Sequence, residues 1–220
     1  MNICMIGAGY VGLVSAACFS EFGWTVTCVD KDPDRLSMLE AGRSPIYEPG
    51  LDDLMTRNMR AGRLLFSSDL ASAVNSADIV FLAVGTPMRR GSGFADLSYV
   101  YAAVEELAPH LNGFTVITTK STVPVGTSRE IERRLKAIRP DAEFAICSNP
   151  EFLREGSAIQ DFTHPDRVLV GTDSAPAREV MQRLYKPLSL RNAPVIFVSR
   201  ESAELAKYAA NAFLALKISF

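Results

Sequence analysis

A glycine-rich turn set between two short apolar segments limits the folds open to this chain. An apolar segment at 2–6 leads into Gly-Ala-Gly-Tyr-Val-Gly at 7–12, and a helical pattern follows. A second apolar segment at 25–29 ends at Asp30. Glycines at this spacing permit a tight turn, a close approach of a ligand to the backbone, and close packing of helix on strand. The sequence therefore predicts a strand–turn–helix–strand unit with a ligand site where the helix begins.

The ligand predicted for this turn is a dinucleotide. A pyrophosphate would lie at the helix N-terminus, where free N–H groups and the helix dipole favour an anion. Asp30 lies 18 residues after Gly12, near the spacing of about 20 at which an acidic residue binds the adenosine ribose. A carboxylate there repels the 2′-phosphate of NADP. We therefore predict NAD as the cofactor, bound by Gly7, Gly9, Tyr10, Val11, Gly12 and Asp30. Arg35 is open to two interpretations, as a ligand of a 2′-phosphate or as part of a solvated helix face.

Composition argues against several other classes of function. Hydrophobic residues make up 48% of the 220 residues and charged residues 22%, as in a globular protein. The net charge of −2 provides no electrostatic attraction to nucleic acid or to an anionic membrane. No apolar run reaches the roughly 18 residues that span a bilayer. The N-terminus enters an apolar segment without a signal peptide, so we expect a cytoplasmic protein.

The four cysteines offer no metal site. Cys4, Cys28 and Cys147 lie in predicted strands and Cys18 on a predicted helix. None forms a Cys-x-x-Cys pair or lies near a histidine, so a zinc site is not expected. We interpret all four as buried structural thiols.

Strand-like and helix-like segments alternate along the chain. The predicted strands are short and mostly apolar throughout, as in a parallel sheet buried on both faces; they lie at 2–6, 25–29, 78–82, 114–118, 143–147, 167–171 and 194–198. The predicted helices lie at 10–22, 33–41, 51–60, 69–75, 97–108, 127–138 and 175–185. This order predicts an α/β fold with a doubly wound, mainly parallel Rossmann-type sheet. We expect a dinucleotide-binding domain over 1–198.

The last segment, 199–220, is predicted to be a long helix. Ser199 and Ser202 are candidate N-caps, and Glu201 and Glu204 would complement the dipole of the first turn. The pattern stops at Phe220 without a cap, which indicates either a helix cut short or an ordinary frayed terminus.

Polar residues follow three of the predicted strands, at the sheet edge where ligands bind. Gly85 and Thr86 follow the strand at 78–82; Ser121, Thr122 and Thr127 follow the next, and Glu151 and Glu155 the one after. The hydroxyls could be caps or turn formers. The two glutamates, if helical, would share a face. They are either a solvated acidic patch with Arg154 as a local partner, or carboxylates for acid–base chemistry.

Lys207 and Asn211 lie four residues apart on the last helix. Their neighbours are apolar nearly all round, which predicts a buried helix. Polar side chains on a buried helix need partners or a polar cavity. The alternative is a lysine that reaches out to solvent.

Taken together, several motifs resemble the UDP-glucose/GDP-mannose dehydrogenase family of nucleotide-sugar dehydrogenases, over essentially the whole chain and closer to its UDP-glucose branch. They are Gly7–Gly12, Val84–Pro87, Ser121–Gly126, Asn149–Gly156 and Glu204–Phe213. The resemblance implies a four-electron oxidation at C6 of UDP-glucose. A first hydride passes to NAD, a cysteine captures the aldehyde, a second NAD takes a second hydride, and the thioester is hydrolysed to UDP-glucuronate.

The resemblance also implies roles for individual residues. Asp30, Arg35, Gly85, Thr86, Thr122 and Glu155 would contact NAD. Glu151 would be the acid–base carboxylate, and Thr122 would orient a water. Lys207 and Asn211 would stabilise the oxyanion at C6. Phe152 and Leu153 would present backbone groups to the sugar nucleotide, next to Arg154.

The chain departs from the family in two respects. It has no Gly-Gly-x-Cys-x-Pro-Lys-Asp-type segment to supply the nucleophile, and no nucleotide-binding second domain. We therefore expect the N-terminal, NAD-binding half of such an enzyme and the start of its connecting helix, on which the whole protein would form a homodimer. This chain should bind NAD without turning over UDP-glucose. The alternatives are a GDP-mannose or UDP-N-acetylhexosamine dehydrogenase, a hydroxyacyl or phosphogluconate dehydrogenase, and a non-catalytic NAD sensor.

Overall fold

The computed structural model describes residues 1–91, 93–190 and 193–220. The strands are β1 (Asn2–Ile6), β2 (Thr25–Val29), β3 (Leu64–Ser67), β4 (Ile79–Leu82), β5 (Thr115–Thr119), β6 (Phe144–Ser148), β7 (Val168–Gly171) and β8 (Val195–Val198). The α-helices are α1 (Tyr10–Glu21), α2 (Pro33–Glu40), α3 (Leu51–Arg60), α4 (Leu70–Asn75), α5 (Ser98–Leu107), α6 (Thr127–Ile138), α7 (Ala158–Thr163), α8 (Ala175–Leu184), α9 (Lys186–Ser189) and α10 (Arg200–Ser219). A 3₁₀ turn, η1, spans Ala108–His110.

These strands form one sheet in the order β3-β2-β1-β4-β5-β6-β7-β8. All pairings are parallel except that of β6 with β7, which meet antiparallel at Ser148 and Gly171. β1 has β2 on one side and β4 on the other, so the chain changes direction across the sheet at β1. This is the switch point beside which a doubly wound sheet binds its ligand. The predicted fold class is confirmed.

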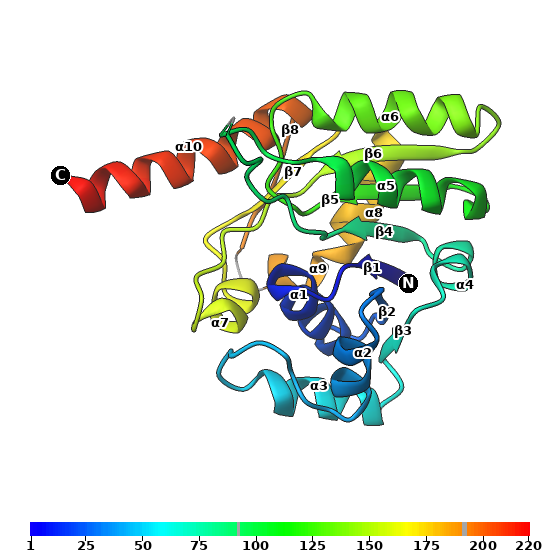
Figure 1. Cartoon of the computed structure of the whole chain (residues 1–220), viewed down its shortest axis with the longest axis vertical. Helices are drawn as coiled ribbons and strands as arrows, with labels where there is room; N and C mark the ends of the chain where they lie inside the picture. Colours follow the sequence, from blue (N-terminus) through cyan, green and yellow to red (C-terminus); the bar gives the residue numbers. More distant parts are fainter. Residues whose placement is uncertain (92, 191–192) are drawn as a thin grey trace.

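Helices cover both faces of the sheet (Figure 1), and the alternation along β1 shows why. Ile3 and Met5 pack in a core with α1, α3, α7 and α8, whereas Cys4 and Ile6 pack on the other face with α4, α5 and α6. Successive side chains of a strand point to opposite faces. A strand that is apolar at every position is therefore buried from both sides.

Elements that the sequence pattern did not predict are short or lie at the edge. β3 has four residues and lies at one end of the sheet, with Leu64 buried and Leu65 half exposed. Its apolar run, from Leu64 to Phe66, is only three residues long. Three other short elements, η1, α7 and α9, were also not predicted.

The final helix is only partly buried, which corrects the prediction of a helix buried all round. Ala203, Glu204 and Lys207 are buried where α10 starts against β6 and β7. The later residues are exposed, including Phe213 and Leu214, and Figure 1 shows this end projecting from the body. An apolar composition buries a helix only where another element covers it. Ser199 is the N-cap, as predicted, since its hydroxyl accepts the Ser202 N–H.

Candidate active site

The glycine turn connects β1 to α1 with the geometry that its spacing predicts. Gly7 has φ +104°, a backbone conformation that is strained for any residue with a side chain. A Cβ on Gly12 would lie 1.9 Å from the Gly7 carbonyl oxygen, so helix and turn pack without room for a side chain. A Cβ on Gly9 would meet no atom within 4 Å, because the space above it is open. The turn is closely packed at Gly7 and Gly12 and open at Gly9, at the N-terminus of a helix. This arrangement suits a pyrophosphate.

Asp30 lies beside this turn. Its Oδ2 accepts the Ala8 N–H at 2.7 Å and Arg35 Nη1 at 2.9 Å, and its Oδ1 accepts the Asp32 N–H at 3.0 Å. Burial acts to raise the pKa of Asp30, but these hydrogen bonds outweigh it and hold the pKa below its usual value. The carboxylate is thus ionised and oriented, and Oδ1 retains a lone pair for a ribose hydroxyl. Arg35 pairs with Asp30 itself.

Hydroxyls hold the loops after β4 and β5 together. Thr86 Oγ1 donates to the Thr122 carbonyl at 2.9 Å, and Ser121 Oγ donates to the Val84 carbonyl at 2.6 Å. Gly85 is exposed and Thr122 is half-buried. These hydrogen bonds therefore join the two loops to each other beside the glycine turn. Thr127 is a turn former, donating to the Pro124 carbonyl at 2.6 Å, while Gly126 is the N-cap of α6.

An ion pair joins the loop after β6 to α10. Lys207 Nζ lies 2.8 Å from Glu151 Oε1, and both side chains are nearly buried, with about a tenth of their surface exposed. Glu151 Oε2 also accepts the Leu153 N–H at 2.6 Å. Lys207 Nζ and the Arg167 guanidinium lie 5.5 and 5.6 Å from the centre of the Phe152 ring. An acid and an ammonium are therefore fixed side by side at the carboxyl ends of the strands.

Three expectations about neighbouring residues need correction. Residues 151–156 form a loop, so Glu151 and Glu155 do not share a helix face, and Glu155 is exposed. Arg154 pairs with Asp161 at 2.7 Å instead of with either glutamate. Asn211 is exposed one turn beyond Lys207, because α10 has already left the sheet there.

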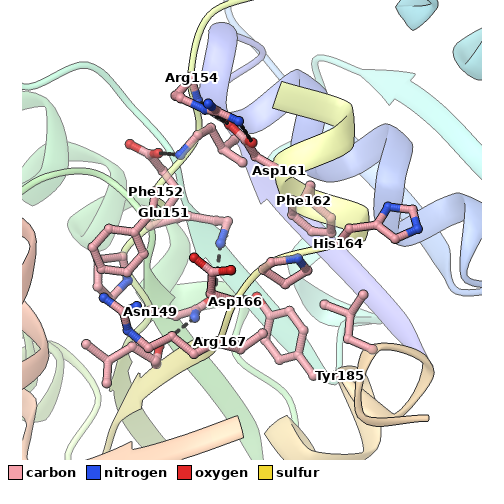
Figure 2. A pocket seen from close by; sticks show the side chains of 17 residues that line it. Asn149, Glu151, Phe152, Arg154, Asp161, Phe162, His164, Asp166, Arg167 and Tyr185 are labelled. Atoms are coloured by element: carbon pink, nitrogen blue, oxygen red, sulfur yellow. Dashed lines mark hydrogen bonds and ion pairs between the residues drawn. The ribbon is translucent and has the colours of Figure 1, made fainter. Parts of the chain in front are cut away.

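A cavity of about 430 Å³ lies against the loop after β6. Its lining includes Glu151, Phe152, Leu153 and Arg154. Figure 2 shows Arg154 and Asp161 joined at one end and Tyr185 towards the other. Neither Asp30 nor the 7–12 turn lines it.

A buried polar network that the sequence analysis missed forms part of the cavity wall. Lys120 is 3% exposed, and its Nζ donates to Asn149 Oδ1 at 3.1 Å. Tyr185 Oη donates to the same oxygen at 2.5 Å, and Asn149 Nδ2 donates to the Leu169 carbonyl at 2.8 Å. Burial lowers the pKa of Lys120 to about 8. A lysine and an asparagine directly after two predicted parallel strands were the available signal.

The cysteines are buried free thiols, as predicted. Burial raises the pKa of Cys4 to about 12 and that of Cys147 to about 11, and raises those of Cys18 and Cys28 further. Thiols that stay protonated at neutral pH are poor nucleophiles. None of the four can therefore take the role of the family cysteine.

The sheet order, the glycine cradle and the oriented Asp30 define a dinucleotide-binding domain of the Rossmann type. The sequence profile described as "UDP-glucose/GDP-mannose dehydrogenase family, NAD binding domain" matches residues 1–189. The chain belongs to this family, and its cofactor is NAD.

Individual relatives agree with this placement. A UDP-glucose 6-dehydrogenase of Rhizobium meliloti is 58% identical over all of this chain and 51% of the relative, and one of Pseudomonas aeruginosa is 48% identical over all of it and 49% of the relative. A UDP-glucose dehydrogenase structure from Pyrobaculum islandicum has a TM-score of 0.95 at 40% identity. A GDP-mannose dehydrogenase structure from Pseudomonas aeruginosa has a TM-score of 0.95 at 32% identity. Both structures are matched over all of this chain and 51% of theirs, so the chain spans about half the length of its relatives.

In the part of the chain that the structure describes, no helix combines the length and apolar character needed to cross a membrane.

Proposed function

We propose that this chain is the NAD-binding half of an enzyme that oxidises UDP-glucose to UDP-glucuronate in a four-electron reaction. The observation that carries the proposal is the Glu151–Lys207 pair at 2.8 Å. This pair lies at the carboxyl ends of the strands, where the cofactor turn also lies. A module that only senses NAD needs no such acid and cation beside its cofactor. The UDP-glucose 6-dehydrogenases at 48–58% identity support the choice of substrate.

The pair suits oxidation of an alcohol. With the substrate C6 hydroxyl between the two side chains, Glu151, directly or through a water held by Thr122, would take the hydroxyl proton. Lys207 would stabilise the negative charge that develops on that oxygen. Bound NAD supplies the acceptor for the hydride that leaves C6, which becomes an aldehyde carbon. We assign Asn211 to the same oxyanion, although it is exposed in this chain.

The remaining binding roles follow the geometry of the site. Gly7, Gly9, Tyr10, Val11 and Gly12 would hold the pyrophosphate, and Asp30 the ribose. Arg35, paired with Asp30, would lie beside the adenosine ribose, and Thr86, Gly85, Thr122 and Glu155 would contact the rest of the cofactor. The 151–154 loop, from Glu151 to Arg154, would face the sugar nucleotide.

The second oxidation needs parts that the described residues do not supply. A nucleophilic cysteine and a nucleotide-binding domain would come from sequence after a connecting helix, of which we propose that residues 199–220 are the start and 1–198 the preceding domain. The exposed Leu205, Phe213, Leu214, Leu216 and Ile218 on α10 would then be covered in a homodimer. A cytoplasmic location would give this enzyme access to its nucleotide sugar.

A GDP-mannose dehydrogenase is the second candidate, since one such structure overlays with a TM-score of 0.95. Its identity of 32% is lower than that of the UDP-glucose enzymes.

The test is a comparison of this chain with the full-length protein. Calorimetry should show NAD binding to both, whereas NADH should form from UDP-glucose only with the full-length protein. GDP-mannose, offered in parallel, should give no NADH. NADH formation by the isolated chain would contradict the proposed division of labour, and preference for GDP-mannose would overturn the substrate.

A further inference from the structure

One buried carboxylate outside the proposed chemistry links the cofactor turn to the 151–154 loop, called the catalytic loop because it carries Glu151. Glu48 comes from the connection between α2 and α3 and is 6% exposed. No ion pair reaches it within residues 1–91, 93–190 and 193–220. A buried carboxylate without a cation must be stabilised by hydrogen-bond donors.

Three donors surround this carboxylate. Tyr10 Oη and the Gly156 N–H donate to Glu48 Oε2 at 2.5 and 2.8 Å. The Ala158 N–H donates to Oε1 at 2.8 Å. Glu48 thus contacts both the first residue of α1 and the turn at 154–158.

The backbone of the 154–158 turn depends on this contact. Gly156 has φ +82°, and Ser157, the N-cap of α7, makes no side-chain capping bond. Glu48 supplies the acceptors for the Gly156 N–H and for the N–H of Ala158, the first residue of α7, which has no partner within its own helix. Loss of its carboxylate would leave both without an acceptor and release the turn just after Arg154.

Tyr10 connects Glu48 to the cofactor turn. Gly9 is the N-cap of α1 and Tyr10 its first residue, so Tyr10 lies where a pyrophosphate would bind. Burial, followed by the hydrogen bond and charge of Glu48, raises the pKa of Tyr10. The hydroxyl therefore stays protonated and continues to donate. Its oxygen also lies 3.4 Å from the Arg154 carbonyl.

We infer that Glu48 is a positioning residue that ties the 154–158 turn to Tyr10, so that cofactor bound at the glycine turn orders the catalytic loop. NAD holds the N-terminus of α1 and with it Tyr10; Tyr10 holds Glu48, and Glu48 holds the Gly156 and Ala158 amides. This inference rests on the proposed function for the role of the loop, but the coupling is a property of this chain alone.

Amide hydrogen exchange of the chain, with and without saturating NAD, tests the coupling. In the unaltered chain, NAD should slow exchange of the Gly156 and Ala158 amides by about tenfold, as expected for restraint by one charge-assisted hydrogen bond. Tyr10→Phe removes only the hydroxyl and should reduce that slowing to less than about twofold at NAD saturation. Tyr99→Phe, the same change on an exposed tyrosine of α5, should leave it at the unaltered value.

Glu48→Gln provides a second test that does not need NAD. One amide oxygen cannot serve three donors, and its NH₂ would oppose one of them. Both amides should exchange about tenfold faster than in the unaltered chain, and Glu40→Gln, at an exposed glutamate on α2, should not alter them.

The outcomes separate the two proposals. Equal NAD-dependent slowing in Tyr10→Phe and the unaltered chain, or unchanged exchange in Glu48→Gln, would overturn the inference and leave the cofactor site intact. Absence of NAD protection at the 7–12 amides themselves would contradict the proposed function and the inference together.

Discussion

Glu204, on the second turn of α10, caps a different helix. Its carboxylate accepts the N–H groups of Gly126 and Ser128 and the Ser128 hydroxyl, at 2.7, 2.7 and 2.6 Å. Glu204 was predicted to complement the dipole of its own helix, but it serves the N-terminus of α6, 76 residues earlier. This contact fixes the start of α10 against the β5–α6 loop, and so sets where Lys207 meets Glu151.

Loss of the Glu204 cap should destabilise the chain. Glu204→Gln leaves one buried donor unsatisfied, and we expect a cost of about 2 kcal/mol in the free energy of unfolding. Glu201→Gln, one turn earlier in an ion pair with the exposed Arg129, should cost less than about 1 kcal/mol. Urea unfolding of the three proteins measures the difference; equal losses would mean that the cap contributes no more than a surface pair.

Substitution of Lys207 should separate chemistry from binding. In the full-length enzyme, Lys207→Ala should lower kcat by at least about a hundredfold with little change in KM, because an oxyanion partner acts mainly in the transition state. Lys217→Ala, at an exposed position on the same helix, is the matched control. A rise in KM alone would make Lys207 a binding residue.

Removal of Asp30 should weaken cofactor binding. Asp30→Ala deletes the ribose acceptor and the partner of the Ala8 N–H, so the Kd for NAD should rise at least about tenfold. Calorimetry on this chain gives the value, with Asp34→Ala, an exposed position on α2, for comparison. Unchanged affinity in Asp30→Ala would show that the glycine turn has been misinterpreted.

Because of Lys120, the free energy of unfolding should increase as the pH is raised above about 8. Burial lowers its folded pKa to about 8, whereas an unfolded lysine titrates near 10.4. Below pH 8 both states are protonated and the folded state bears the full cost of the buried charge. Between these pKa values the unfolded state binds more protons, so stability increases with pH.

The comparison variant is Lys120→Met, whose apolar side chain suits the neighbouring Phe81 and Phe162 rings. The stability of the unaltered chain relative to this variant should increase by roughly 3 kcal/mol from pH 7 to pH 10.5. Urea titrations at several pH values measure it, and a constant difference would mean that Lys120 titrates normally.

Most of the fold was predictable because its signals are local. The central strands are short and mostly apolar, so pattern alone located seven of the eight strands in the described residues to within one residue at each end. The exception, β3, lies at one end of the sheet and has an apolar run of only three residues. The antiparallel entry of β7 was also not specified, since a strand's own sequence does not determine its direction in a sheet.

The sequence by itself determined the cofactor turn, because Gly7, Gly9 and Gly12 act through their own backbone and the lack of a side chain. Only the tertiary structure decided the partners of the charged residues. Glu151 pairs with Lys207, Glu204 caps α6, and Glu48 joins Tyr10 to the 154–158 turn. These contacts join groups 38 to 110 residues apart, and a carboxylate is satisfied by whichever donors the packed elements bring to it.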